Sequence, residues 1–359
     1  MQESGTSIAE FFANLVATLN GYIWSTALIS LALGAGIFYT ILTRFVQVRL
    51  FGEMIRLLFS SKESDKGISS FQALAVSLSG RVGTGNIAGV AAAIGFGGPS
   101  AVFWMWMVAL LGSATAYIES ALGQIYKEEI DGQYRGGPAF YIEKAMGQKW
   151  YAWIFAIVTI FACGILLPGV QSNSIGNAAN LAVGGDTMVN FFGDSVAADK
   201  LVTGVVVVAV LGFIIFGGVK RIAHVTQVIV PVMAIGYILM AVGIIIYHIA
   251  ELPASIALIF SVIFNPMAGL GAAIGWGVKR GIYSNEAVQG SGPHAEASSE
   301  VQHPAQQFLV QSFSLYVDKL FVCSATAFMI LITQQYYVNG LDESIIGGLL
   351  GPEVIISSP

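Results

Sequence analysis

The chain has 359 residues, of which 55% are hydrophobic and only 10% are charged, and its net charge is −5. A soluble domain carries roughly a quarter of charged residues, so this chain has more apolar side chains than a single core can bury. The acidic balance and the lack of a long basic run argue against a nucleic-acid partner. Cys163 and Cys323 each lie in an apolar run and are expected to be packing residues. The composition predicts an all-α polytopic membrane protein.

Eight segments are long and apolar enough to cross a bilayer, some of them with polar interruptions. In chain order they are 22–47, 69–97, 99–126, 150–183, 201–217, 225–249, 267–291 and 306–335. Basic residues such as Arg49 and Lys144 follow the first, third and fifth spans, whereas the opposite loops contain only Lys200. The positive-inside tendency therefore predicts that both termini lie outside the cytoplasm. Within the loop 127–149, Pro138 is placed to begin a short helix at the membrane interface.

Two of these spans carry polar and glycine residues where a membrane helix needs neither. The second span is interrupted around GRVGTGN, residues 80–86, and the seventh around WGVKRGIYSNE, residues 276–286. Charged residues inside a bilayer are costly, but an unwound segment lined by other helices removes much of that cost and frees its backbone groups for ligands. Two interrupted helices at corresponding places in two halves are typical of secondary transporters with inverted repeats.

Other interpretations of these residues remain open. Gly277 and Gly281 have the small-x-x-x-small spacing of close helix packing, which needs no interruption. Arg81 is expected to pair with Glu119 or Glu286 on another helix, in preference to attracting a ligand directly. Asp318 and Lys319 are adjacent in the eighth span, and on an α-helix they would point about 100° apart, too far to pair with each other.

The spacing of the interruptions predicts how the chain is organised. Residues 1–66 would form an N-terminal segment with an extra transmembrane helix and a cytoplasmic loop. Residues 67–250, with spans two to six, would form the first repeat of five helices. Residues 251–359, with spans seven and eight, would begin the second repeat, and three further helices would be missing, so we expect a chain truncated at its C-terminus.

Six motifs in series resemble one transporter family. SGRVGTGNIAGVAAAI, GGPSAVFWMW, GGPAFYIEKAMG, VQSNS, WGVKRGIYSNEA and VDKLFVCSATA follow in the order found in the alanine/glycine:cation symporter family. The resemblance implies the five-plus-five inverted-repeat fold of LeuT-like transporters with one extra N-terminal helix. It also implies uptake of alanine or glycine with Na⁺, or with H⁺, across a prokaryotic inner membrane.

The resemblance also implies a set of site residues. The substrate would be bound by Gly83, Thr84, Gly85 and Asn86 at the first interruption, by Gln171 in the fourth span, and by Trp276, Gly277 and Asn285 in the seventh. Backbone carbonyls of Val82 and Ser79 would hold Na⁺. In the family, a helix beyond residue 359 completes the cation site. Neither an organic cofactor nor an obligate protein partner is indicated.

Two other functions fit the sequence less well. RVGTGN, residues 81–86, vaguely resembles the filter of a cation channel, but such filters need several copies around an axis and this segment occurs once. A membrane-embedded enzyme is disfavoured because the sequence has no HExxH or GxSxG motif and no obvious catalytic carboxylate pair.

Overall fold

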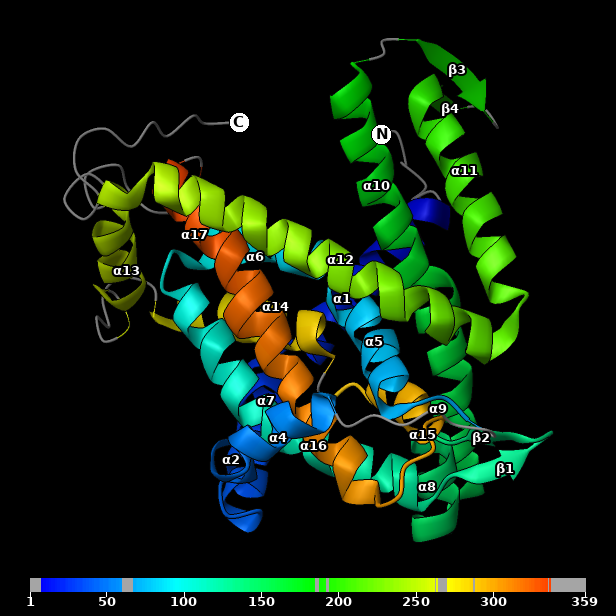
Figure 1. Ribbon diagram of the computed structural model, residues 1–359. Coiled ribbons are helices and arrows are strands. Elements are labelled where there is room, and N and C mark those ends of the chain that lie inside the picture. The colour runs from blue at the N-terminus through cyan, green and yellow to red at the C-terminus, as the bar shows by residue number, and fades with distance from the viewer. Residues whose placement is uncertain are drawn as a thin grey trace, which may run out of the picture.

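The computed structural model describes residues 8–59, 67–184, 187–191, 194–261, 263, 270–286, 288–334 and 336, and these are mostly helical. Figure 1 shows long helices packed side by side, with two small β-hairpins at opposite ends of the molecule. The prediction of an all-α polytopic membrane protein is confirmed at this level, and the hairpins are additions that the sequence did not predict.

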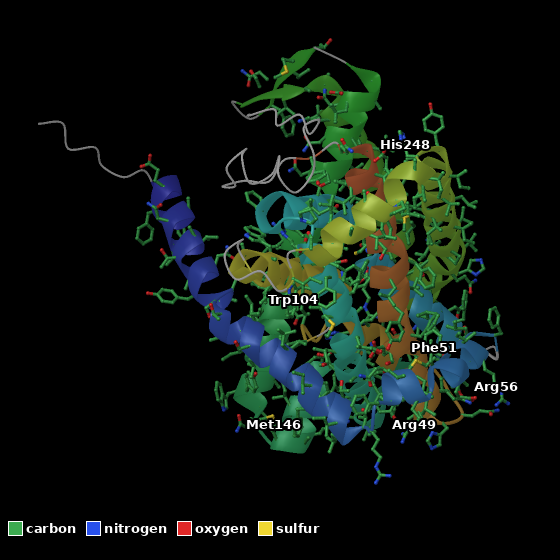
Figure 2. The ribbon with its side chains drawn as sticks, turned by 90° about the vertical axis from the view of Figure 1, so that its left-hand side faces the viewer. Arg49, Phe51, Arg56, Trp104, Met146 and His248 are labelled. Carbon is green, nitrogen blue, oxygen red and sulfur yellow. The ribbon has the colours of Figure 1, made fainter. Side chains whose placement is uncertain are left out.

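The N-terminal helices lie beside the main body. They are α1 (Ile8–Ile23), α2 (Thr26–Leu42), α3 (Val46–Arg49) and α4 (Phe51–Leu58). Helix α1 is exposed along its described side chains and projects from the body in Figure 2, whereas α2 packs against α7 through Ile29 and Ala32.

The second predicted span is two helices. Helix α5 (Ser70–Arg81) begins with a capping box, in which the Ser69 hydroxyl accepts the Gln72 amide and the Gln72 side chain accepts the Ser69 amide. Helix α6 (Thr84–Gly97) follows after Val82 and Gly83, and α7 (Ala101–Ile125) is the third span.

The loop after α7 contains the hairpin of β1 (Glu128–Ile130) and β2 (Gln133–Arg135), paired antiparallel with Ile130 opposite Gln133. Helix α8 (Pro138–Met146) follows, with Pro138 in its first turn, as the sequence predicted.

The next segments are mostly long apolar helices, with one β-hairpin between two of them. They are α9 (Lys149–Phe161), the π-helix η1 (Ala162–Leu166), α10 (Leu167–Val183), β3 (Met188–Phe191), β4 (Asp194–Ala197), α11 (Ala198–Ile215), α12 (Gly218–Tyr247), the 3-10 helix η2 (Ile249–Glu251) and α13 (Leu252–Ser261). Strands β3 and β4 join α10 to α11 as an antiparallel hairpin with Met188 opposite Ala197. The π-helical turn lies just before Pro168, which has no amide hydrogen to give to the α-helical ladder.

The last described helices are α14 (Leu270–Asn285), α15 (Gly292–Ala297), α16 (Pro304–Tyr316), the π-helix η3 (Val317–Cys323) and α17 (Ser324–Thr333). The interruption predicted within the seventh span was therefore wrong, and the second interruption is a bend that begins only where α14 ends. The sequence predicted it at 276–286, whereas α14 runs unbroken through Asn285 and the chain leaves it at Glu286. Gly277 and Gly281 serve packing instead, and a Cβ on Gly281, for example, would lie 3.0 Å from the Val108 side chain on α7.

Within the described residues, six helices are long and apolar enough to cross a membrane: 10–42, 101–125, 149–183, 198–215, 218–247 and 304–333. They correspond to six of the eight predicted spans. The other two are the interrupted ones, whose separate pieces are too short or too polar to qualify alone. In the helices at 149–183 and 198–215, none of the residues in the apolar 18-residue stretch is buried inside the protein. These helices therefore present apolar side chains outward, as contact with lipid requires.

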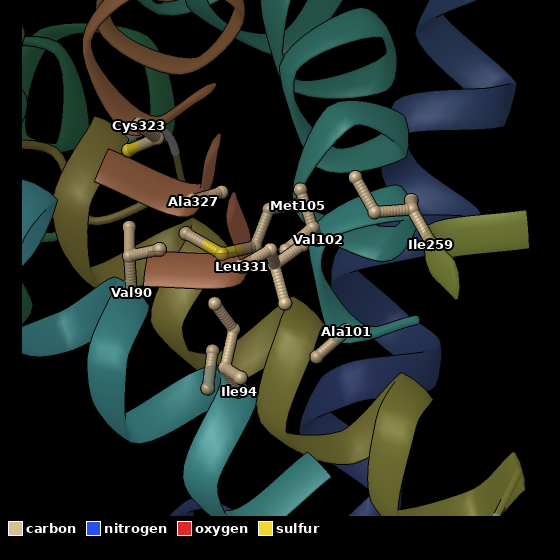
Figure 3. Close-up of a cluster of buried hydrophobic side chains, with 10 residues drawn as sticks. Val90, Ile94, Ala101, Val102, Met105, Ile259, Cys323, Ala327 and Leu331 are labelled. Atoms are coloured by element: carbon tan, nitrogen blue, oxygen red, sulfur yellow. The ribbon is translucent and has the colours of Figure 1, made fainter. Parts of the chain in front are cut away.

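The largest core lies where α6, α7, α13 and α17 meet. Figure 3 shows Val90, Ile94, Met105, Ile259 and Leu331 interlocking there, all at most 1% exposed. In Figure 2, Arg49, Arg56 and Met146 lie toward one end of the molecule and His248 lies toward the other. The basic loops that follow the first and third predicted spans therefore share one end.

Candidate functional site

The first interruption separates α5 from α6 by two extended residues. Val82 has ψ 100° and Gly83 has φ −170° and ψ −143°, after which the helix resumes at Thr84. The Asn86 side chain holds the turn, because its Oδ1 accepts the Gly83 amide at 3.0 Å. The interruption predicted at residues 80–86 is confirmed, and it leaves the N-terminus of α6 facing the interior.

Gln171 on α10 caps that N-terminus. Its Oε1 accepts the Thr84 amide at 3.1 Å and also the Thr84 hydroxyl. A Cβ on Gly83 would lie 3.1 Å from Gln171 Nε2, so a glycine lets the two helices approach. The first turn of a helix carries a partial positive charge and unpaired amides, which makes it an anion site. A neutral amide oxygen occupies that position here.

The other end of the Asn86 side chain faces η3. Asn86 is 0% exposed, and its Nδ2 donates to the carboxylate of Asp318, which also accepts the Ser284 hydroxyl at 3.1 Å. Asp318 Oδ2 lies 3.0 Å from Lys319 Nζ, and both side chains are fully buried. The expectation that these neighbours cannot pair was wrong, because they lie in a π-helix, whose wider turn reduces the angle between successive side chains.

The second interruption follows α14 directly. Glu286, Val288 and Gly290 all have positive φ, at 54°, 70° and 76°, so the chain cannot continue as a right-handed helix. The Glu286 carboxylate accepts the Ser291 hydroxyl at 2.8 Å. A Cβ on Gly80 would lie 3.0 Å from Glu286 Oε1, which brings the second interruption against the end of α5.

A pocket of about 480 Å³ lies between the two interruptions and is bounded on its other side by α10 and α11. Five of the predicted site residues line it: Ser79, Val82, Gly83, Gly85 and Gln171. Tyr283, Ser284 and Gln289, which the sequence did not single out, also line it. Cys163 lines it as well and is exposed, so the expectation that it is a packing residue was wrong, whereas Cys323 is buried as expected. Tyr283 and Ser284 reach it because Gly85 lets α6 approach α14, where a Cβ on Gly85 would lie 3.2 Å from the Ser284 side chain.

The remaining predicted residues lie outside the pocket lining. Trp276 stacks on Phe96 of α6, with ring centroids 4.6 Å apart. Gly277 packs against α7, since a Cβ there would lie 2.5 Å from the Ala101 carbonyl oxygen and 2.7 Å from the Trp104 side chain. Asn285 is fully buried at the end of α14. Trp276 therefore does not line the pocket.

Arg81 is buried beside the pocket and pairs with a residue that the sequence did not suggest. Its NH2 lies 3.7 Å from Glu296 Oε1, and its NH1 donates to Gln311 Oε1 at 3.3 Å and to the Ser314 hydroxyl. The ion pair of Arg81 is therefore with Glu296 and not with Glu119 or Glu286. Within the part of the chain that the structure describes, no three His, Cys, Asp or Glu side chains are grouped to hold a metal ion.

An interrupted helix whose N-terminus lies at a pocket between apolar spans is typical of a membrane carrier and not of a soluble enzyme. The model of the sodium:alanine symporter family matches residues 9–347, and the chain belongs to that family. This is a family of transporters, not of enzymes.

Several relatives agree with this membership. YrbD of Bacillus subtilis, assigned as a sodium/proton-dependent alanine carrier, is 58% identical over 93% of this chain and 67% of its own length. GlnT of the same organism, assigned as a sodium/glutamine symporter, is 42% identical over 92% of this chain and 68% of its length. The sodium/proton-dependent alanine carrier of Bacillus sp. PS3 is 46% identical over 84% of this chain and 66% of its length. The chain thus spans about two thirds of these relatives.

Proposed function

We propose that this protein carries a small neutral amino acid, alanine or glycine, into the cell together with Na⁺, by alternating access across the inner membrane. In this proposal both termini of the chain lie outside the cytoplasm. The observation that carries the proposal is the N-terminus of α6, which is capped only by a neutral amide and lies at a pocket lined from both interruptions. The names of the alanine carriers among its relatives support the choice of substrate.

The substrate carboxylate binds at the N-terminus of α6 in this proposal. The amides of Thr84 and Gly85 lie in the first turn, where a helix offers unpaired donors and a positive dipole end. Gln171 Oε1 holds this position when no substrate is bound, and it gives way to a carboxylate because a charged acceptor makes stronger hydrogen bonds than a neutral amide.

The coupling cation binds next to the carboxylate, at the backbone carbonyls of Val82 and Ser79. Both residues line the pocket at the end of α5, where the α-helical ladder stops and carbonyls lose their partners. Na⁺ prefers such oxygen ligands, and the nearby substrate carboxylate adds attraction in a medium of low dielectric constant. H⁺ is the alternative coupling ion, as the names of two relatives indicate.

Asn86 and the residues of α14 act around the ligand. Asn86 holds the turn through Gly83 and ties α6 to Asp318. Trp276 and Gly277 set the position of α14 against α6 and α7. Asn285 is a polar contact for a state in which the pocket closes around the substrate.

Alternating access follows from the inverted-repeat organisation that the sequence predicted, with an N-terminal segment at 1–66, a first repeat at 67–250 and the start of a second at 251–359. The position of both interruptions at one pocket supports this organisation. The helices that carry the interruptions would rock against the others and expose the pocket to one side of the membrane at a time.

The test is uptake of labelled alanine into proteoliposomes with and without an inward Na⁺ gradient. We expect saturable uptake that a Na⁺ gradient drives and an equal outward gradient opposes. Uptake that is indifferent to every cation gradient would reject coupling. Electrical recording of the same vesicles separates a carrier from a channel, because a channel passes unitary currents that do not saturate with amino acid.

A further inference from the structure

The ion pair of Arg81 and Glu296 joins the two interrupted segments. Arg81 is the last residue of α5, directly before the first interruption, and Glu296 is on α15, directly after the second. Their side chains are 1% exposed each, and Arg81 NH2 lies 3.7 Å from Glu296 Oε1. Gly292 permits the approach, since a Cβ there would lie 2.9 Å from both atoms. Any movement of α5 against α15 therefore changes the distance between these charges.

The charges around Arg81 do not balance. Glu119 on α7 and Glu286 act electrostatically on the same guanidinium as Glu296, so three carboxyl groups share one cation. The other titratable groups near Glu296 are Tyr141 on α8, which is neutral at physiological pH, and His294 on α15, whose side chain is exposed. Like charges that are buried together cannot all ionise, so at least one of the three carboxyl groups retains a proton at neutral pH.

Of these three carboxyl groups, Glu296 has the geometry that best suits the one that retains the proton. One carboxyl oxygen faces Arg81, whereas Oε2 is buried and makes no hydrogen bond of good geometry among the described residues. The Ser120 hydroxyl also acts on this carboxyl group, and it lowers the pKa less than burial raises it. Around the pair, the buried donors Arg81 Nε and Gln311 Nε2 also lack partners in that part of the chain. Burial raises the pKa of Glu296 to about 7, and Arg81 opposes the rise. An unpaired buried carboxyl oxygen is costly as an anion and far less so when it carries a proton.

We propose that Glu296 is a proton-binding site of this carrier, loaded while α5 and α15 are packed together and emptied as they separate. The proposal rests on the alternating-access function above. When α5 moves away, water reaches the carboxyl group, its O–H bond breaks, and the proton passes to water on the side that the pocket faces. The carboxylate left behind is hydrated until the carrier has turned its pocket to the other side of the membrane, where a proton from the water on that side binds as α5 packs against α15 again. Proton affinity thus depends on the conformational state, which is what coupling requires.

The experiment follows protons and alanine in the same proteoliposomes. Pyranine inside the vesicles reports acidification when alanine is added outside, and labelled alanine reports uptake between pH 5.5 and 8.5. Alanine–alanine exchange, which needs no net proton movement, is measured alongside as a check that the carrier is assembled. We compare wild type, Glu296→Gln and the matched control Glu143→Gln, which removes a surface acid 3.4 Å from Lys149 on the same side of the molecule.

We expect alanine to acidify the wild-type vesicles, and net uptake to fall by up to about tenfold per pH unit on the alkaline side. Glu296→Gln should abolish the acidification and flatten the pH profile, whereas Glu143→Gln should behave as wild type. Acidification that persists in Glu296→Gln, or wild-type uptake without any acidification, would overturn the proton site and leave alanine transport standing.

A wild type without alanine exchange would instead reject the proposed function, and the proton site with it. If Glu296→Gln lacks exchange because it does not fold, Glu296→Asp decides the question. The shorter acid keeps a titratable group but changes its distance from Arg81, so the midpoint of the pH profile should shift. A midpoint identical to wild type would overturn the proposal.

Discussion

Replacing Gln171 with glutamate puts a permanent carboxylate at the N-terminus of α6. The side chain has nearly the same shape, and its Oε1 already lies 3.1 Å from the Thr84 amide and accepts the Thr84 hydroxyl. A charge turns these into charge-assisted hydrogen bonds, about twice as strong as neutral ones, and interacts with the helix dipole by about 0.3–1 kcal/mol. We therefore expect α6 to be stabilised by about 1–2 kcal/mol.

The same change should block the substrate. Before the carboxylate of alanine can reach the Thr84 amide, that stabilisation must be given up and two like charges must approach each other. Since 1.4 kcal/mol corresponds to tenfold in affinity, Gln171→Glu should weaken alanine binding by about tenfold or more. Equilibrium binding of labelled alanine to the purified protein measures this, and thermal unfolding measures the stabilisation.

Gln289→Glu is the matched control. Gln289 lines the same pocket, but its Nε2 donates to the Ile282 carbonyl at 3.0 Å, away from α6. It adds the same charge to the pocket without occupying the helix N-terminus. If Gln171→Glu binds alanine like wild type, or if both variants lose affinity equally, the carboxylate does not bind at α6 and the reasoning is refuted.

Two further predictions concern packing around the site. Lys319→Met leaves the buried Asp318 unpaired and should lower the free energy of unfolding by about 3–5 kcal/mol, whereas adding Asp318→Asn should recover most of the loss. Chemical denaturation in detergent measures both, and equal losses in the single and double variants would contradict the pairing. Gly277→Ala should cost about 1–3 kcal/mol of stability, because its Cβ would lie 2.5 Å from the Ala101 carbonyl oxygen. Its folded fraction should bind alanine with unchanged affinity, and a lower affinity would show that the position faces the substrate.

The first interruption could be predicted because glycines and polar residues coincide there with a span that must otherwise be helical. The second was predicted wrongly within α14, because glycine gives the same signal for two different structures. A residue without a side chain lets the backbone unwind, and it also lets a neighbouring helix approach. At Gly277 the neighbour is α7, and only the three-dimensional arrangement identifies it.

The ion pairs could not be predicted from the sequence, for a related reason. A π-helical turn has no clear local signature, so the pairing of Asp318 with Lys319 could not be anticipated from an α-helical wheel. Arg81 and Glu296 are far apart along the chain and meet only because α15 turns back against α5 and α7. The charged residues could be identified from the sequence, but their partners depend on how the helices pack.

The most direct measurement removes a single amide hydrogen. Thr84 occupies the first position of α6, where proline is tolerated because its missing N–H has no partner within the helix. If that amide grips the substrate carboxylate, Thr84→Pro should keep its fold and lose alanine binding by about tenfold or more, whereas Thr84→Ala, which retains the amide, should lose much less. Alanine bound equally well by a correctly folded Thr84→Pro would contradict the account.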